Sequence, residues 1–186
     1  ICQAEEEKTR QHISTFTVIP SSDGARAMDD TRFHRDALIF EHWLLDNPED
    51  PRAWFYLAQS YRDAGQPEKS IMPLEKCIEL SQWPEEIYVC EMRLARYKIQ
   101  MGQPFTEALP HYWKAYNDHP FRAEPLSDML SHYMGSKMYN VGVLIGEKAL
   151  AIPFPEHARL FAEPETYTWR IKDSLSVCYY WVGRFT

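Results

Sequence analysis

The sequence predicts an all-α protein made of consecutive antiparallel helix pairs, and three features support this class. The first is the run from Trp54 to Gly65, whose W-x2-L-A-x2-Y-x3-G spacing places large apolar residues on one helix face and a glycine at the following turn. The second is that a glycine recurs at similar intervals: Gly102 follows Gly65 by 37 residues, and Gly135 follows Gly102 by 33. The third is the helical period of apolar residues on both sides of these glycines. One helix pair cannot bury its apolar face alone, so we expect the pairs to stack.

The same spacing resembles that of tetratricopeptide-type (TPR) repeats. The resemblance implies TPR-like antiparallel helix pairs stacked in a right-handed superhelix over residues 31–186. Ala108-x3-Tyr112-x2-Ala115-x4-Pro120 has the gaps of a TPR second helix. The expected parts are a lone helix at 31–46 and units at 51–82, 84–120, 121–152 and 165–186, the last without its second helix.

Prolines and glycines predict where these helices start, bend and pack closely. Pro51 starts the first helix of unit one, where a missing N–H costs nothing. Pro73 falls within an expected helix from about 67 to 80, and Pro110 within the second helix of unit two, so we expect a bend at each. Gly142 and Gly146 each cost a helix roughly 1 kcal/mol relative to alanine, which predicts close helix packing there.

Two segments depart from the helical pattern. Residues 1–30 are expected to form an extended arm or the remnant of a preceding domain, with a short strand at 13–19 and a turn at 21–24. Residues 153–164 are bounded by prolines and make a longer excursion before unit four.

Composition narrows the class of protein. The net charge of −7 argues against nucleic acid as the main partner. No apolar run reaches the roughly 18 residues of a membrane span, and the acidic start does not resemble a signal peptide, so no membrane partner and a cytoplasmic location are expected. Because Ile1 is not a translation start, we expect the chain to be a piece of a longer protein.

Cysteines and histidines show no metal spacing, so neither a metal nor a cofactor is expected. Cys77, Cys90 and Cys178 are predicted to be reduced, buried core residues. Glu107 and His111 lie four apart and are interpreted as a surface pair.

Part of the chain, about residues 23–186, resembles the helical region that follows the catalytic domain in a group of family 2 glycosyltransferases. The motifs that carry this resemblance are Pro51–Gly65, Trp83-x-Glu85-Glu86-x-Tyr88, Ala149-Leu150-x-Ile152-Pro153-x-Pro155 and Tyr167-x-Trp169-Arg170-x3-Ser174-Leu175-Ser176. The resemblance implies that 23–26 lie just past a nucleotide-sugar domain. It does not imply activity in this chain, which lacks that domain's D-x-D metal motif. Asp29 and Asp30 are interpreted as helix-capping residues, so no catalytic residue is expected.

A ligand groove is predicted on the first helices of the units, which line the concave face of a TPR array. Arginine pairs bidentately with carboxylates and phosphates, which predicts an acidic peptide, a phosphate-bearing group or a glycan acid as ligand. The candidate residues are Arg52, Gln59, Arg62, Arg96, Arg122, His132 and Arg170.

The alternative is that these arginines pair with neighbouring acids, as Arg62 would with Asp63 or Glu91. A carboxylate clamp of the chaperone-binding type is not supported, because Phe55 and Gln59 occupy positions that need Lys and Asn. The tryptophans are interpreted as core and inter-repeat packing rather than sugar platforms. They are Trp54, Trp83, Trp113, Trp169 and Trp181.

Three functional hypotheses follow. The first is a non-catalytic TPR-like scaffold for protein association, as an accessory region of a glycosyltransferase. The second is that the parent chain is an active family 2 glycosyltransferase whose catalytic domain lies outside this sequence. The third is a homo-oligomer formed through the uncapped unit four, where a missing helix would leave apolar surface.

Overall fold

The computed structural model describes residues 29 and 31–184, and all regular structure in that part of the chain is helical, as predicted. Residues 33–186 form one unit. Of the preceding unit, the Asp29 carboxylate accepts hydrogen bonds from the backbone N–H and hydroxyl of Thr31 at 3.0 and 2.7 Å. The expected strand at 13–19 and the turn at 21–24 lie outside the described residues.

Between residues 31 and 184 eight α-helices follow one another, with a 3-10 helix before α3 and a π-helical turn before α8. Their bounds are α1 Arg32–Asp46, α2 Pro51–Asp63, η1 Pro67–Ser70, α3 Ile71–Leu80, α4 Pro84–Gln100, α5 Phe105–Asp118, α6 Glu124–Gly135, α7 Tyr139–Leu150, η2 Thr166–Arg170 and α8 Ile171–Trp181.

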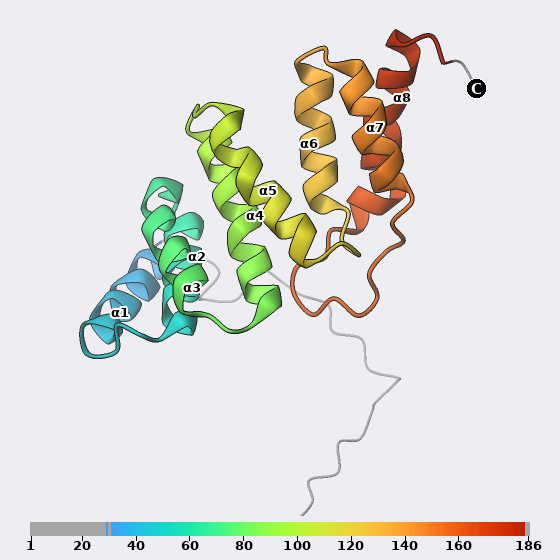
Figure 1. The fold of residues 1–186 in the computed structure, drawn as a ribbon. Helices are drawn as coiled ribbons and strands as arrows, with labels where there is room; N and C mark the ends of the chain where they lie inside the picture. The colour runs from blue at the N-terminus through green and yellow to red at the C-terminus, as the bar shows by residue number, and fades with distance from the viewer. Residues whose placement is uncertain (1–28, 30, 185–186) are drawn as a thin grey trace, which may run out of the picture. The chain divides into compact units, whose positions relative to one another are not determined.

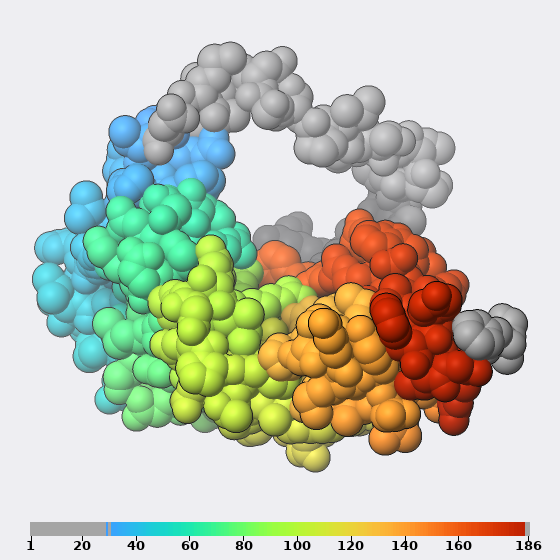
Figure 2. Space-filling view, turned by 90° about the horizontal axis from the view of Figure 1, so that it is seen from above, coloured from blue at the N-terminus to red at the C-terminus, as the bar shows by residue number. Residues whose placement is uncertain are grey.

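Neighbouring helices in sequence are neighbours in space. Helix α2 packs against α3, α4 against α5, and α6 against α7, with α8 against both α6 and α7 (Figure 1). The space-filling view shows the same order on the surface, from the blue α1 to the red α8 (Figure 2). Each helix therefore buries its apolar face against elements adjacent in the chain.

The turns that follow several of the helices contain a residue with left-handed backbone conformation. Gly65, Gly102 and Gly183 have φ of 73°, 74° and 75°, as expected for helix-ending glycines. Gly135 differs from the prediction, because it is the last residue of α6 and Lys137 takes the positive φ of 60°.

The two prolines behave differently. The expected helix from 67 to 80 is divided into η1 and α3, and Pro73 is the third residue of α3. An N–H in the first turn of a helix has no intrahelical acceptor. Pro73 therefore removes no hydrogen bond from α3, and its position does not require a bend. Pro110 does lie inside α5, where it removes the hydrogen bond to the carbonyl of Thr106.

One large hydrophobic core runs from α2 to α8, and a smaller cluster of Ala37, Leu44, Ala53 and Leu57 joins α1 to α2. Gly142 and Gly146 of α7 are closely packed, as predicted. A Cβ atom at these positions would lie 2.7 Å from Cys178 Sγ and 2.8 Å from Leu175 Cδ1, respectively.

Cys77, Cys90 and Cys178 are free and buried, as expected. Of the tryptophans predicted to pack in the core or between repeats, Trp113, Trp169 and Trp181 are exposed and not core residues, although Trp181 stacks on Tyr139 of the neighbouring helix α7. A helix face can carry an aromatic residue at core spacing and still face solvent when no neighbouring helix covers it. Within the described residues, no helix has the length and apolar character needed to cross a membrane.

Candidate functional site

A cleft of about 420 Å³ opens between α2, α4 and the segment that precedes α8. Four arginines line it, together with apolar side chains and two glutamates. We call it the arginine cleft; its lining is Arg62, Tyr88, Val89, Met92, Arg93, Arg96, Tyr97, Arg122, Glu124, Phe161, Ala162 and Glu163.

Helix α4 supplies half of this lining. Val89, Arg93 and Arg96 are spaced four and three residues apart, so they share one face of α4. Pro84 begins the helix, and its first turn carries Glu85 and Glu86, which favour the positive end of the helix dipole. One regular helix thus places two arginines in the cleft.

The opposite wall is a loop held by side chains from distant parts of the chain. Glu85 Oε2 accepts hydrogen bonds from the backbone N–H groups of Arg159 and Leu160 at 2.8 and 2.9 Å. Arg122 donates to the carbonyl oxygens of Leu160 and Phe161 at 2.9 and 3.1 Å. These four bonds fix the proline-bounded excursion against α4 and the start of α6.

Arg122 and Glu124 form the buried floor of the cleft. Arg122 is 1% exposed, and its Nη2 lies 2.9 Å from Glu124 Oε1. The hydroxyls of Tyr167 and Tyr88 donate to Glu124 Oε2 at 2.7 and 3.2 Å. Burial alone would raise the pKa of Glu124, but the hydrogen bond and charge of Arg122 outweigh it and lower the pKa.

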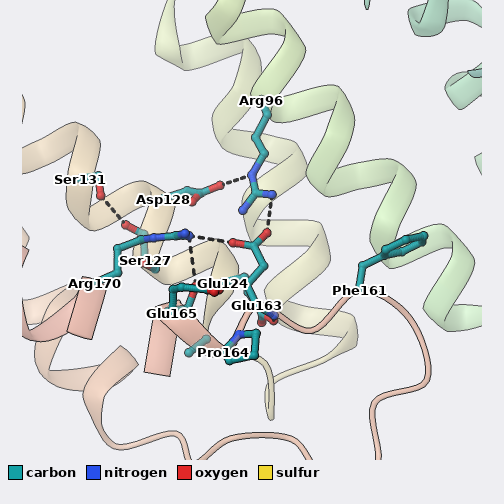
Figure 3. Close-up of polar contacts among 12 residues, drawn as sticks. Arg96, Glu124, Ser127, Asp128, Ser131, Phe161, Glu163, Pro164, Glu165 and Arg170 are labelled. Atoms are coloured by element: carbon teal, nitrogen blue, oxygen red, sulfur yellow. Dashed lines mark hydrogen bonds and ion pairs between the residues drawn. The ribbon is translucent and has the colours of Figure 1, made fainter. Parts of the chain in front are cut away.

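Glu163 joins two arginines at the edge of the cleft. Its carboxylate accepts from Arg96 Nη1 at 2.5 Å and from Arg170 Nη1 at 2.7 Å, and Arg96 Nε also donates to Asp128 at 2.6 Å (Figure 3). Burial would raise the pKa of Glu163, yet these two guanidinium groups lower it. Arg96 and Arg170 are therefore committed to internal ion pairs.

Arg62 forms an ion pair with its sequence neighbour. Its Nη2 lies 2.7 Å from Asp63 Oδ1, and both side chains are partly exposed. Of the two partners considered for Arg62, Asp63 is the one it contacts. Glu91 instead contacts His111 Nδ1 at 2.6 Å, so the expected surface pairing of His111 with Glu107 is replaced by a contact between α4 and α5.

Arg93 is the cleft residue that sequence reasoning missed. Its side chain is 8% exposed, its guanidinium carbon lies 4.9 Å from the ring centroids of Phe55 and Phe161, and its buried Nη1 has no hydrogen-bond partner among the described residues. Burial and the charge of Arg62 lower its pKa. The available signal was an arginine inside the apolar run Val89-Cys90-Glu91-Met92-Arg93-Leu94-Ala95.

The remaining predicted residues lie elsewhere. Arg52 pairs with Glu86 at 3.0 Å and lies over the Trp83 ring, and Gln59 does not line the cleft. His132 stacks on Phe105 with ring centroids 3.5 Å apart, in a neighbouring cavity of about 340 Å³ that also includes Arg96. The cleft therefore brings together Arg62, Arg96 and Arg122, and not the other four candidates.

No protein-family model matches the sequence, and no curated protein matches it significantly. The chemistry of the site rests on its geometry alone. Across residues 29 and 31–184, no three metal-ligating side chains come together. The groups that line the arginine cleft are suited to binding an anion through guanidinium hydrogen bonds beside an apolar wall.

Proposed function

We propose that the helical domain is a non-catalytic scaffold that binds an acidic protein segment in the arginine cleft. The observation that carries the proposal is the charge balance in and around the cleft. The four arginines of the cleft, Arg170 beside it and the four carboxylates that pair with these arginines together carry one net positive charge, in a protein with a net charge of −7. These groups are Arg62, Arg93, Arg96, Arg122 and Arg170, with Asp63, Glu124, Asp128 and Glu163.

The size of the cleft supports binding of a short segment. A volume of about 420 Å³ accommodates one or two side chains rather than a folded surface. Met92, Val89 and the Phe161 ring supply apolar contact, while the arginines supply orientation. This combination favours a peptide with an acidic residue beside an apolar one.

The architecture that we propose for this scaffold is the TPR-like right-handed superhelix. The sequential packing of α2–α3, α4–α5 and α6–α7, each joined by a short turn, supports it. Arg62 and Arg96, two of the residues predicted for the groove, come from the first helices of two such pairs, which supports the concave-face hypothesis.

The cellular role that we propose from the sequence motifs is protein association as an accessory region of a glycosyltransferase. The alternative is a parent enzyme of family 2 with its catalytic domain outside this chain. The reading frame around this sequence distinguishes them: an upstream nucleotide-sugar domain with a D-x-D motif favours the enzyme, and an unrelated upstream domain favours the scaffold.

The binding proposal is tested with a panel of ten-residue peptides of matched apolar content and graded acidity, measured by fluorescence polarisation. We expect acidic peptides to bind more tightly than neutral ones, and Arg62→Glu to weaken them by about tenfold or more, since a charged hydrogen bond is replaced by repulsion. Arg96 is not substituted in this test, because it forms ion pairs with Asp128 and Glu163 within the protein.

The matched control is Lys148→Glu, which makes the same charge change at an exposed residue of α7 that does not line the cleft. Equal weakening by both variants would assign binding to net charge rather than to the cleft. Equal affinity for acidic and neutral peptides would refute the proposal.

A further inference from the structure

Arg93 is the arginine of the cleft that has no carboxylate partner among the described residues. Arg62 contacts Asp63, Arg96 contacts Asp128 and Glu163, and Arg122 contacts Glu124. No hydrogen bond or ion pair of this kind is made by Arg93, although its side chain is more than nine-tenths buried. A buried polar group without a partner is unfavourable, so this arrangement calls for a ligand.

The surroundings of Arg93 define how a ligand reaches it. The guanidinium carbon lies over the rings of Phe55 and Phe161, at 4.9 Å from both centroids, and Nη1 is left for hydrogen bonding. The planar edge of a guanidinium matches the two oxygens of a carboxylate. Stacking on the rings holds the group in place before the ligand arrives.

Phe161 is the side chain of this subsite that is free to change its rotamer. It lies in a loop, its side chain is 54% exposed, and its backbone has a φ of 45°, an unfavourable conformation for an aromatic residue. Arg122 holds its carbonyl oxygen, so the backbone stays in place while the ring turns. We expect an entering group to displace this exposed ring when it contacts Arg93.

The charge of the ligand group follows from the neighbouring acids. Glu124 and Glu163 line the same cleft, and each is held ionised by arginines. A carboxylate has one negative charge, which neutralises the unpaired cation Arg93. A dianionic phosphate has a second negative charge, which Glu124 and Glu163 would repel. The nearby Arg62 adds to the attraction for a single negative charge.

We infer that Arg93 is the anchor of the arginine cleft and pairs edge-on with one carboxylate of the bound segment, while a neighbouring apolar side chain of that segment packs on Phe161. The carboxylate belongs to an Asp or Glu side chain or to a C-terminus. This inference rests on the proposed binding function and specifies its ligand class.

The test uses three capped dipeptides that differ only in charge. Acetyl-Glu-Phe-amide carries a side-chain carboxylate, acetyl-Gln-Phe with a free C-terminus carries an α-carboxylate, and acetyl-Gln-Phe-amide carries neither. Affinities come from titrations followed by NMR, with the Nε–Hε signal of Arg93 as the local reporter. We expect at least one charged dipeptide to bind about tenfold more tightly than the neutral one and to shift that signal. The tighter of the two identifies the source of the carboxylate.

Arg93→Met keeps the aliphatic stem between the rings and removes the charge. We expect it to abolish the difference between charged and neutral dipeptides, while the exposed control Lys148→Met in α7 retains it. Arg93→Lys keeps the charge without the planar fork, and we expect it to lose most of the difference. Should Arg93→Met not fold, Arg93→Lys and the Nε–Hε shift decide.

Equal binding of charged and neutral dipeptides to the native protein would overturn the inference, as would a difference that survives in Arg93→Met. Phenyl phosphate binding ten times more tightly than either carboxylate would overturn the assignment of the ligand class. If ten-residue acidic peptides bind in an Arg62-dependent manner but ignore Arg93→Met, the inference fails while the proposed function stands.

Discussion

Arg122 and Glu124 form a buried ion pair whose guanidinium also holds the carbonyl oxygens of Leu160 and Phe161. The pair thus joins the start of α6 to the loop that walls the arginine cleft. Its two members lie two residues apart, but its effect reaches a segment nearly forty residues away.

Removing one member of this pair is expected to be strongly destabilising. Glu124→Gln leaves the buried Arg122 charge uncompensated, which costs about 3–5 kcal/mol in comparable sites. Urea denaturation followed by circular dichroism measures the free energy of unfolding. The double variant Arg122→Met/Glu124→Leu should lose less than Glu124→Gln, because no charge remains buried alone. A loss below about 1 kcal/mol for Glu124→Gln would show that the pair is not a structural anchor.

Substitution of Gly146 by alanine is expected to destabilise the packing of α7. The new methyl group would lie 2.8 Å from Leu175 Cδ1 and 3.2 Å from Leu130 Cδ2, and overpacking of this kind costs about 1–3 kcal/mol. The matched control is Gly135→Ala at the end of α6, where nothing lies within 4 Å of a Cβ atom. The control should be neutral or stabilising by up to about 1 kcal/mol, since alanine favours helix. Thermal unfolding of both variants checks the contrast.

Replacing Lys137 by glycine is expected to stabilise the α6–α7 turn. Lys137 has a φ of 60°, which costs a residue with a Cβ about 1 kcal/mol, and glycine adopts this conformation freely. Part of the gain is offset by the greater freedom of glycine in the unfolded chain. Gly65→Ala, at a φ of 73°, should show the opposite sign. Denaturant midpoints that fall for Lys137→Gly would contradict the strain argument.

His119 is expected to make the protein less stable below neutral pH. Its ring is buried against Tyr88 and Phe121, and burial together with the charge of Arg122 lowers its pKa. In the unfolded chain the imidazole binds a proton as pH falls through about 6.5, whereas the folded state resists protonation. Stability is therefore full above that value and declines as pH falls from there to the folded-state pKa.

The measurement for His119 is the thermal midpoint between pH 8 and 5. His119→Gln should show a smaller decline than the native protein over this range. Parallel curves would mean that His119 does not determine the pH response.

Much of the helical framework could be predicted because its signals are local. A helix face and a helix-ending glycine depend on residues within about four positions, so Pro51 at the start of α2 and Gly65 at its end follow from spacing. The close packing at Gly142 and Gly146 followed from two glycines on one helical stripe. Lys137 was missed because the short α6–α7 turn places its left-handed residue two positions after Gly135.

The candidate site could be predicted only in part. Arg62, Arg96 and Arg122 were expected in one groove and do line one cleft, whereas Arg52 and His132 pack in other places. Arg93 was not expected, since an arginine in an apolar run has no pattern that distinguishes a buried anchor from a surface residue.

Local sequence therefore decided the helices, their turns and their small, closely packed residues. Tertiary structure decided which arginines are paired and which is left without a partner. Arg96 meets Glu163 across 67 residues, and Glu85 holds Leu160 across 75. Charge pairing depends on distances that exist only after the chain has folded, because the interaction of two charges varies with their separation in space and with the solvent between them.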